Sequence, residues 1–271
     1  MPLSRRHLFA AGSTLLLARP SFSAARPSAP QPSPSGVPDT FPAEPPELVQ
    51  EMVRVSHFDL ARVRELVEAR PALARATWDW GYGDFESALG AASHVGQREI
   101  AELLIAHGAR PDLFAAAMLG QLDVVRAWVA ASPGVQAITG PHGITLVSHA
   151  RAGGERAVPV LRYLEGLGDA DPKPALAPLA EADREALLGT YAFGSGARDV
   201  LVVEMTQVGA AVKSLALRRA DGVPRALSHR GDRAFSPAGA DAVRLRFSSE
   251  SPAATLSVWD PDLRVTAQRA K

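Results

Sequence analysis

Cysteine is absent from the chain, and lysine is almost absent: of its 271 residues only Lys173, Lys213 and Lys271 are lysines. Without cysteine the protein can form no disulfide bond, no thiolate metal site and no cysteine nucleophile. Its stability must therefore come from the packing of apolar residues, which make up 46% of the chain. The length leaves room for about two domains.

An excess of charge of one sign is also absent. Lysine and arginine together number 29, aspartate and glutamate number 29, and the formal net charge is zero. Binding to nucleic acid requires a basic face that neutralises phosphates. We therefore expect no nucleic-acid partner.

Long hydrophobic runs are missing as well. The apolar stretch Leu8–Ala18 is shorter than the roughly 20 residues that a transmembrane helix needs. It follows Arg5 and Arg6, and small residues after it permit cleavage behind Ala25, so residues 1–25 resemble an export signal of the twin-arginine type. The alternatives are a general secretory signal or an ordinary N-terminus. We expect a periplasmic or secreted protein with no transmembrane span once the signal is removed.

Composition divides the rest of the chain into four further segments. A run rich in proline and serine predicts a disordered linker, a helical period of apolar residues follows, and a second proline-rich stretch separates it from a region of alternating residues. The predicted segments are a linker over 26–46, a helical region over 47–168, a linker over 169–180 and a β domain over 181–271.

The helical region contains a pattern that occurs more than once. In Ser87–Asp112, small residues precede Gly96, the apolar Ile100 and Leu104 share one helix face, and Gly108 ends the helix. Similar turns recur around Gly120 and further along the chain, which gives about four irregular units. The pattern resembles the ankyrin repeat. Two further segments, the Trp/Gly-rich finger Asp79–Asp84 and the Gly-Pro-His-Gly turn at residues 140–143, resemble those of exported bacterial ankyrin-repeat proteins. The resemblance implies an α-solenoid that binds a protein partner.

The last segment changes to a period of two. Leu245 and Phe247 alternate with Arg244 and Arg246, and Gly- and Pro-containing turns separate about six such runs. Leu188-Gly189-Thr190-Tyr191, followed by the alternating runs and by Phe235-Ser236-Pro237, resembles the β-meander appended to bacterial serine hydrolases, and the resemblance brings no catalytic residue. The predicted fold class is multidomain α plus β: an ankyrin-repeat α-solenoid followed by a small antiparallel β-meander or open barrel.

The finger Trp78–Glu86 concentrates aromatic side chains, acids and glycines in nine residues. Clustered aromatics on a loop are typical of a binding hot spot, but they can equally fold back as a lid over the helical core. Both interpretations stay open. The candidate binding residues are Trp80, Tyr82, Asp84, Phe85, Glu86, His94, His142 and His149.

A polar set within the same region offers a second interpretation. Three histidines and three acids are placed where the finger and the helices can meet, and such donors can bind a divalent metal; they are His94, His142, His149, Asp79, Asp84 and Glu86. The alternative is that these histidines bond to backbone carbonyl groups and pin the helices together. His57, His107 and His229 are expected to be solvated or packing residues.

No motif for catalysis or for cofactor binding is present. The sequence contains no nucleophile elbow, no H-E-x-x-H, no phosphate loop and no dinucleotide fingerprint. We assign no catalytic residue, no cofactor and no metal. The predicted function is that of an exported scaffold that binds a protein partner through its concave face and finger loops. The first alternative is a periplasmic protein that binds a small molecule or a metal, and that is possibly hydrolytic, through the His/carboxylate set. The second is that the β domain binds while the helices only present it.

Overall fold

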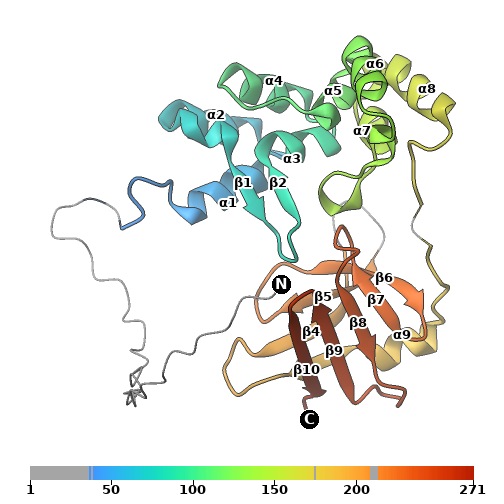
Figure 1. Ribbon diagram of the computed structural model, residues 1–271. Coiled ribbons are helices and arrows are strands. Elements are labelled where there is room, and N and C mark those ends of the chain that lie inside the picture. Colours follow the sequence, from blue (N-terminus) through green and yellow to red (C-terminus); the bar gives the residue numbers. More distant parts are fainter. Residues whose placement is uncertain (1–36, 38, 174, 208–212) are drawn as a thin grey trace, which may run out of the picture. The chain divides into compact units, whose positions relative to one another are not determined.

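The computed structural model describes residues 37, 39–173, 175–207 and 213–271 (Figure 1). The predicted export signal and most of the first linker lie outside the described residues. The chain separates into two compact units, Met1–Ala43 and Glu44–Lys271. All the helices and strands given below belong to the second unit.

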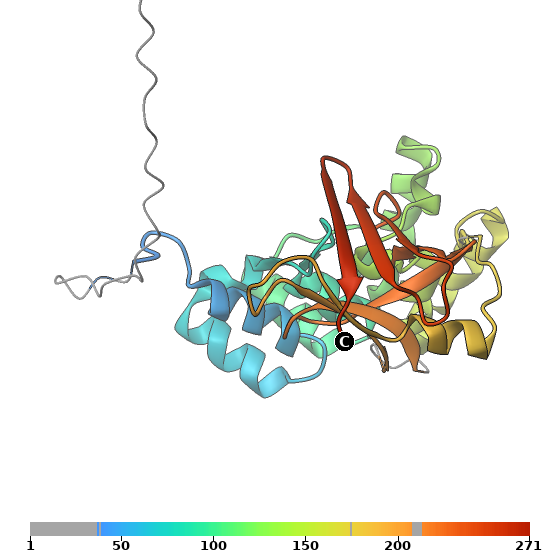
Figure 2. The same ribbon diagram turned by 90° about the horizontal axis from the view of Figure 1, so that it is seen from below.

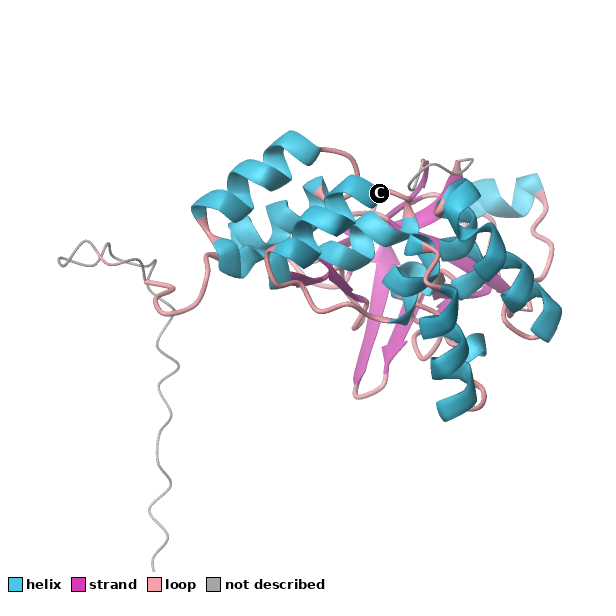
Figure 3. Ribbon diagram, turned by 90° about the horizontal axis from the view of Figure 1, so that it is seen from above, coloured by secondary structure: helices cyan, strands magenta, loops and turns pink. Residues whose placement is uncertain are grey.

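Helices fill the first part of this unit, and most of the strands follow them (Figure 3). The α-helices are α1 (Pro46–Val55), α2 (Leu60–Ala69), α3 (Ala88–His94), α4 (Arg98–Ala106), α5 (Leu113–Leu119), α6 (Leu122–Ala131), α7 (Leu146–Ala152), α8 (Val158–Leu167) and α9 (Glu181–Leu187). Short 3-10 helices are η1 (Pro71–Arg75), η2 (Val135–Ala137), η3 (Pro141–Gly143) and η4 (Gly154–Ala157).

Capping side chains explain where several helices begin. The carboxylate of Asp59 accepts a hydrogen bond from the backbone N–H of Arg62 at 2.9 Å, which confirms the predicted start of α2. Asp112 caps α5 in the same way, with the N–H of Ala115 as donor at 2.7 Å. Pro159 sits in the first turn of α8, where its missing N–H costs nothing.

Consecutive helices pair and bury apolar stripes against one another. Ile100 and Leu104 of α4 are buried, as their spacing predicts, in one core with α1, α2 and α3. A second core joins α5, α7 and α8. Gly120 ends α5 with φ 75° and lies so close to the backbone carbonyl of Arg156 that any Cβ at this position would clash.

The spacing of the helix pairs is uneven along the chain. The first helices of the four pairs, α1, α3, α5 and α7, start at Pro46, Ala88, Leu113 and Leu146. A constant period, which lets each unit pack identically on the next, is what defines a repeat solenoid. The described helices therefore do not show the predicted ankyrin-repeat solenoid of about four irregular units, and the coarser prediction of a helical region followed by a β region is confirmed.

A two-stranded hairpin interrupts the helices between η1 and α3. Its strands β1 (Thr77–Asp79) and β2 (Phe85–Ser87) pair antiparallel, with Trp78 opposite Glu86. The tip between them carries Tyr82 at φ 61°, flanked by two glycines that also have positive φ. Figure 1 shows this hairpin projecting from the helices.

The C-terminal strands form a closed antiparallel barrel. In space they run β10-β3-β4-β5-β6-β7-β8-β9, so the chain winds up and down and the last strand closes on the first. The strands are β3 (Gly189–Ala192), β4 (Val200–Thr206), β5 (Ser214–Arg219), β6 (Arg225–Gly231), β7 (Ala234–Pro237), β8 (Arg244–Phe247), β9 (Thr255–Asp260) and β10 (Leu263–Arg269). Figure 2 shows the β9–β10 hairpin in red.

Closure corrects the prediction of about six strands in an open arrangement. Gln268 of β10 pairs with Ala192 of β3, a contact between the two ends of the domain that no local alternation of residues can reveal. The alternation itself is confirmed, because Leu245 and Phe247 are buried while Arg244 and Arg246 are exposed. Closure provides hydrogen-bond partners for the backbone groups of the two edge strands, which an open meander would leave unpaired.

The two ends of the barrel differ. Helix α9 leads into β3 and covers one end, where Arg269 donates hydrogen bonds to the carbonyl oxygens of Ala186, Leu188 and Ala253. The ring of Tyr191 packs under this guanidinium at 4.9 Å and its hydroxyl donates to Leu187. This end is therefore sealed, and any space inside the barrel must open toward the other end.

None of the helices in the described part of the chain combines the length and the hydrophobicity that crossing a membrane requires.

Candidate metal centre

Four side chains from separate elements converge near the β1–β2 hairpin. His57 follows α1, Glu86 lies in β2, His94 is the last residue of α3 and His142 lies in η3. One donor atom from each lies within 4.8 Å of every other. We call these four residues the His/Glu cluster.

The three imidazoles present the same nitrogen to the cluster. Nε2 of His57 lies 3.0 Å from Nε2 of His94, and Nε2 of His94 lies 2.9 Å from Oε1 of Glu86. Nε2 of His142 lies 3.4 Å from the same Oε1. Tetrahedral zinc with bonds of about 2.0–2.1 Å holds neighbouring ligand atoms roughly 3.3 Å apart, so these three separations are close to the edges of such a set, and the other donor separations lie within 4.8 Å.

Two of the remaining ring nitrogens face acceptors. Nδ1 of His57 lies 3.0 Å from the carbonyl oxygen of Arg54, and Nδ1 of His142 lies 2.6 Å from Oδ2 of Asp84 and 3.2 Å from Nη1 of Arg225. Because the nearest partner of each nitrogen lacks a proton, we assign the proton to Nδ1 in both rings. When these two rings are neutral, the lone pair of Nε2 points into the cluster, which is the arrangement that histidine ligands of metals adopt.

Glu86 is the buried anion of the cluster. Its side chain has no exposed surface, and Oε2 accepts a hydrogen bond from the indole N–H of Trp80 at 2.7 Å. Oε1 is also buried, but its approaches to His94 and His142 lack hydrogen-bond geometry, so it has no hydrogen-bond partner. A buried carboxylate oxygen without such a partner is costly unless a cation completes its environment.

Electrostatics keeps the two carboxylates ionised. Burial alone would raise the pKa of Glu86, but the neighbouring His142, His57 and His94 outweigh it and lower this pKa. Burial likewise opposes ionisation of Asp84, and the bonds from His142 with the charge of Arg225 lower its pKa. The same two carboxylates overcome the burial of His142 and raise its pKa to about 9. Without a metal, the cluster is an ion network in which a protonated His142 lies beside the two carboxylates.

Asp84 links the cluster to the barrel. Its Oδ1 accepts the backbone N–H of His142 at 2.9 Å, and its carboxylate forms a buried ion pair with Arg225 of β6. Arg225 also donates to the carbonyl oxygen of Ala238. Gly239 then meets the backbone of His142 so closely that a Cβ would lie 2.9 Å from its Cα. The barrel therefore holds η3, and with it His142, in position.

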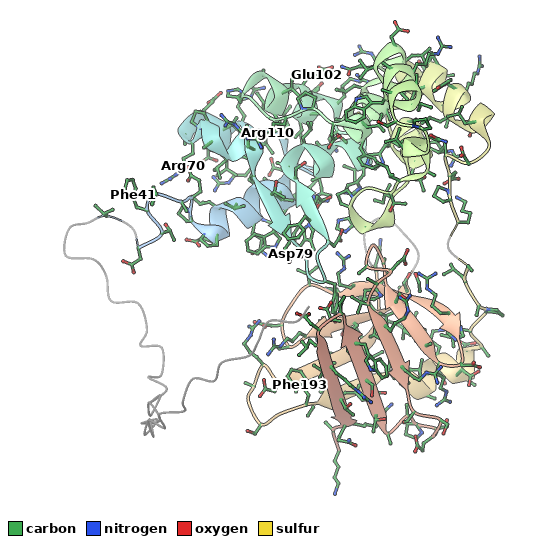
Figure 4. All side chains as sticks on the ribbon, viewed as in Figure 1. Phe41, Arg70, Asp79, Glu102, Arg110 and Phe193 are labelled. Atoms are coloured by element: carbon green, nitrogen blue, oxygen red, sulfur yellow. The ribbon has the colours of Figure 1, made fainter. Side chains whose placement is uncertain are left out.

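The other candidate residues have different surroundings. His149 of α7 is fully buried beside Phe114 and its Nδ1 lies 2.8 Å from the carbonyl oxygen of Thr145, the backbone role that was the alternative to metal binding. Burial lowers the pKa of His149 to about 4, so this ring is neutral. Asp79, labelled in Figure 4, is not one of the four cluster residues, and its carboxylate accepts a hydrogen bond from the N–H of Gly81.

The aromatic residues of the hairpin divide between two cores. Trp78 and Trp80 pack against the helical core, while Tyr82 packs against the core of the barrel. Phe85 is 62% exposed. The tryptophans thus follow the lid interpretation, and Phe85 is the only one of these four side chains presented mainly to solvent.

His57 was expected to be a solvated or packing residue, and the structure places its ring in the cluster. The dipeptide Ser-His occurs four times, at Ser56-His57, Ser93-His94, Ser148-His149 and Ser228-His229, and the cluster contains the first two of these histidines. The dipeptide alone therefore does not identify a ligand. The hydroxyls of Ser56 and Ser93 both donate to the carbonyl oxygen four residues earlier.

Comparison with protein-family models, with curated proteins and with solved structures gave no match. The predicted membership of the ankyrin family is corrected by this result together with the uneven helix pairs. The predicted likeness of the C-terminal region to the meander of serine hydrolases is corrected by the closed eight-strand barrel.

Proposed function

We propose that this protein binds a divalent transition-metal ion, zinc in particular, through Nε2 of His57, His94 and His142 and the carboxylate of Glu86. The observation that carries the proposal is the convergence of these donors around the buried, unpartnered Oε1 of Glu86. Imidazole with carboxylate is a ligand set that suits zinc, and the chain offers no thiolate to compete.

The proposed metal has a structural role. Four protein donors complete a tetrahedral shell, which is the arrangement of structural sites, whereas catalytic sites keep one position for water. The four ligands come from the α1–α2 connection, β2, α3 and η3, so a single ion joins elements that are distant in sequence. The metal would thereby fix the β1–β2 hairpin on the helices.

Two outer contacts support the ligands. Asp84 orients the ring of His142 and the indole of Trp80 orients Glu86. Such partners set the tautomer and basicity of ligands, and their loss commonly costs about 10–100-fold in metal affinity. Export to the periplasm and binding of a protein partner remain predictions from the sequence, and the proposal is independent of both.

The test is zinc binding by the full chain after chelator treatment, followed by dialysis and metal analysis. The wild-type chain should retain one zinc ion, and Glu86→Gln and His94→Gln should lose it. His107→Gln is the matched control, because His107 lies on α4's end and bonds to Leu103 outside the cluster. Circular dichroism establishes that each variant is folded.

If Glu86→Gln fails to fold, His57→Gln replaces it, since the His57 side chain is 23% exposed and tolerates a polar replacement. A folded wild-type chain that binds no more zinc than these variants would overturn the proposal. The cluster would then be an ion network that only stabilises the packing of the helices.

A further inference from the structure

A cavity of about 600 Å³ lies inside the barrel. Its walls come from residues at the ends of β3, β5 and β9 and at the starts of β4, β6 and β10, all at the end opposite α9. Apolar side chains dominate its lining: Leu201, Leu217, Val258, Val265, Phe193 and Tyr82. Cavities of roughly 300–1,000 Å³ with such linings are the usual sites of small-molecule ligands, and eight-stranded barrels are wide enough for one.

The rim of the cavity is apolar too. Val223, in the β5–β6 connection, is 51% exposed, and Leu263, at the start of β10, is 58% exposed. Phe193, labelled in Figure 4, lies just beyond β3 and also lines the cavity. Exposed apolar side chains beside an apolar cavity favour an apolar occupant, which would cover them as it enters.

The three arginines of the lining are already paired with acids. Arg218 bonds to Glu204 at 2.9 Å, Arg219 lies 3.6 Å from Asp199, and Arg225 pairs with Asp84. The one acid among the lining residues is Asp260. The lining therefore carries no surplus positive charge that would select an anion such as a fatty acid.

Tyr82, at the tip of the β1–β2 hairpin, is a lining residue of the cavity that does not belong to the barrel. Its backbone has φ 61°, which is rare for a bulky residue, and the glycines on both sides also adopt positive φ. This backbone carries the ring onto the barrel core beside the cavity. Strain of this kind persists where the surrounding structure requires one particular placement.

We propose that the barrel cavity is a binding site for one small, uncharged, predominantly apolar molecule that enters past Val223 and Leu263 and contacts Tyr82. None of the four residues of the His/Glu cluster lines this cavity, but Trp80 and Arg225 line it and also contact Glu86 and Asp84, respectively.

The test is a fluorescence titration of the full chain with Nile red, a neutral apolar dye, followed by displacement with decanol or with decanoate. Saturable binding with preferential displacement by decanol is expected. Val265→Trp fills the cavity and should weaken dye binding by about tenfold or more, whereas Leu176→Ser, an exposed apolar residue outside the lining, should leave it unchanged.

If Val265→Trp does not fold, the rim variant Val223→Ser with Leu263→Ser serves instead, because both residues are exposed; it should weaken binding by about threefold. The proposal is overturned if the folded chain shows no saturable binding, if neither the cavity nor the rim variant weakens it, or if decanoate displaces better than decanol. The titration is repeated with His94→Gln, so that loss of metal and loss of the dye are scored separately.

Discussion

The helical region buries a charged cluster beside its two apolar cores, whereas the core of the barrel is apolar. The helices enclose Glu86 without exposed surface, Asp84 and three facing imidazoles, while the barrel encloses Tyr191, Phe235 and aliphatic residues around an apolar cavity. Buried charge is stable only when it is paired or bound to a cation, whereas an apolar cavity can remain without polar partners. The difference locates a cation site in the first region and a site for an apolar ligand in the second.

The β1–β2 hairpin belongs to both regions. It places Glu86 and Asp84 in the polar site and Trp80 and Tyr82 on the wall of the apolar one. The predictions below break or sharpen this contrast, in order of decreasing effect on the free energy of unfolding.

The largest effect is expected where the two regions meet. Arg225→Met leaves Asp84 buried and without its guanidinium partner, and the free energy of unfolding should fall by about 3–5 kcal/mol. Urea denaturation measures this loss in the free energy of unfolding. The matched control is Arg218→Met, whose ion pair with Glu204 is partly exposed and should contribute less than about 1 kcal/mol. Equal losses in the two variants would contradict the account.

The pH dependence of stability should report His149. Burial lowers its pKa from 6.5 in the unfolded chain to about 4, so the unfolded chain binds the proton first as the pH falls. The contribution of the neutral His149 to the free energy of unfolding is complete above pH 6.5. It is lost progressively as the pH falls to 4, and the total loss is about 3 kcal/mol. Glu86 and His94 act on this ring from nearby, and the pKa of Glu86 is lowered, so its titration lies outside the window.

Urea unfolding at several pH values measures the contribution of His149 to stability. A chelator is present, so that metal release does not contribute. His149→Phe should flatten the dependence between pH 6.5 and pH 4. A variant that keeps the wild-type slope would show that other groups control the acid stability.

Zinc should stabilise the wild-type chain by mass action. At free zinc about 100-fold above the dissociation constant, the free energy of unfolding should rise by about 2.7 kcal/mol. Thermal unfolding with and without zinc measures this shift, which His94→Gln should abolish and His107→Gln should preserve. An equal shift in the two variants would mean that zinc binds elsewhere.

The smallest effect concerns a helix cap far from either site. Asp112→Ala removes the acceptor for the N–H of Ala115 and should cost about 1 kcal/mol. Zinc binding and dye binding should stay at wild-type levels, which makes this variant a control for general loss of stability.

Local features of the fold could be predicted from the sequence, because they depend on neighbouring residues. The cap at Asp59, the place of Pro159 and the alternation around Leu245 are of this kind. Closure of the barrel depends on Gln268 meeting Ala192, and local periodicity carries no information about that pairing.

The site was predictable in part for the same reason. Asp84, Glu86, His94 and His142 were grouped because the finger and the helix ends were expected to meet. His57 was missed because its place depends on how α1 packs on α3, and His149 was included although its ring lies outside the four donors. The proposed metal was not assigned, since no ligand motif of fixed spacing is present.

The most direct test of the central claim is anomalous diffraction from crystals of the zinc-loaded full chain, with data above and below the zinc edge. The account predicts a single strong peak about 2.0–2.1 Å from Nε2 of His57, His94 and His142 and from a carboxylate oxygen of Glu86. Zinc-loaded crystals with no anomalous peak among these four side chains would contradict it.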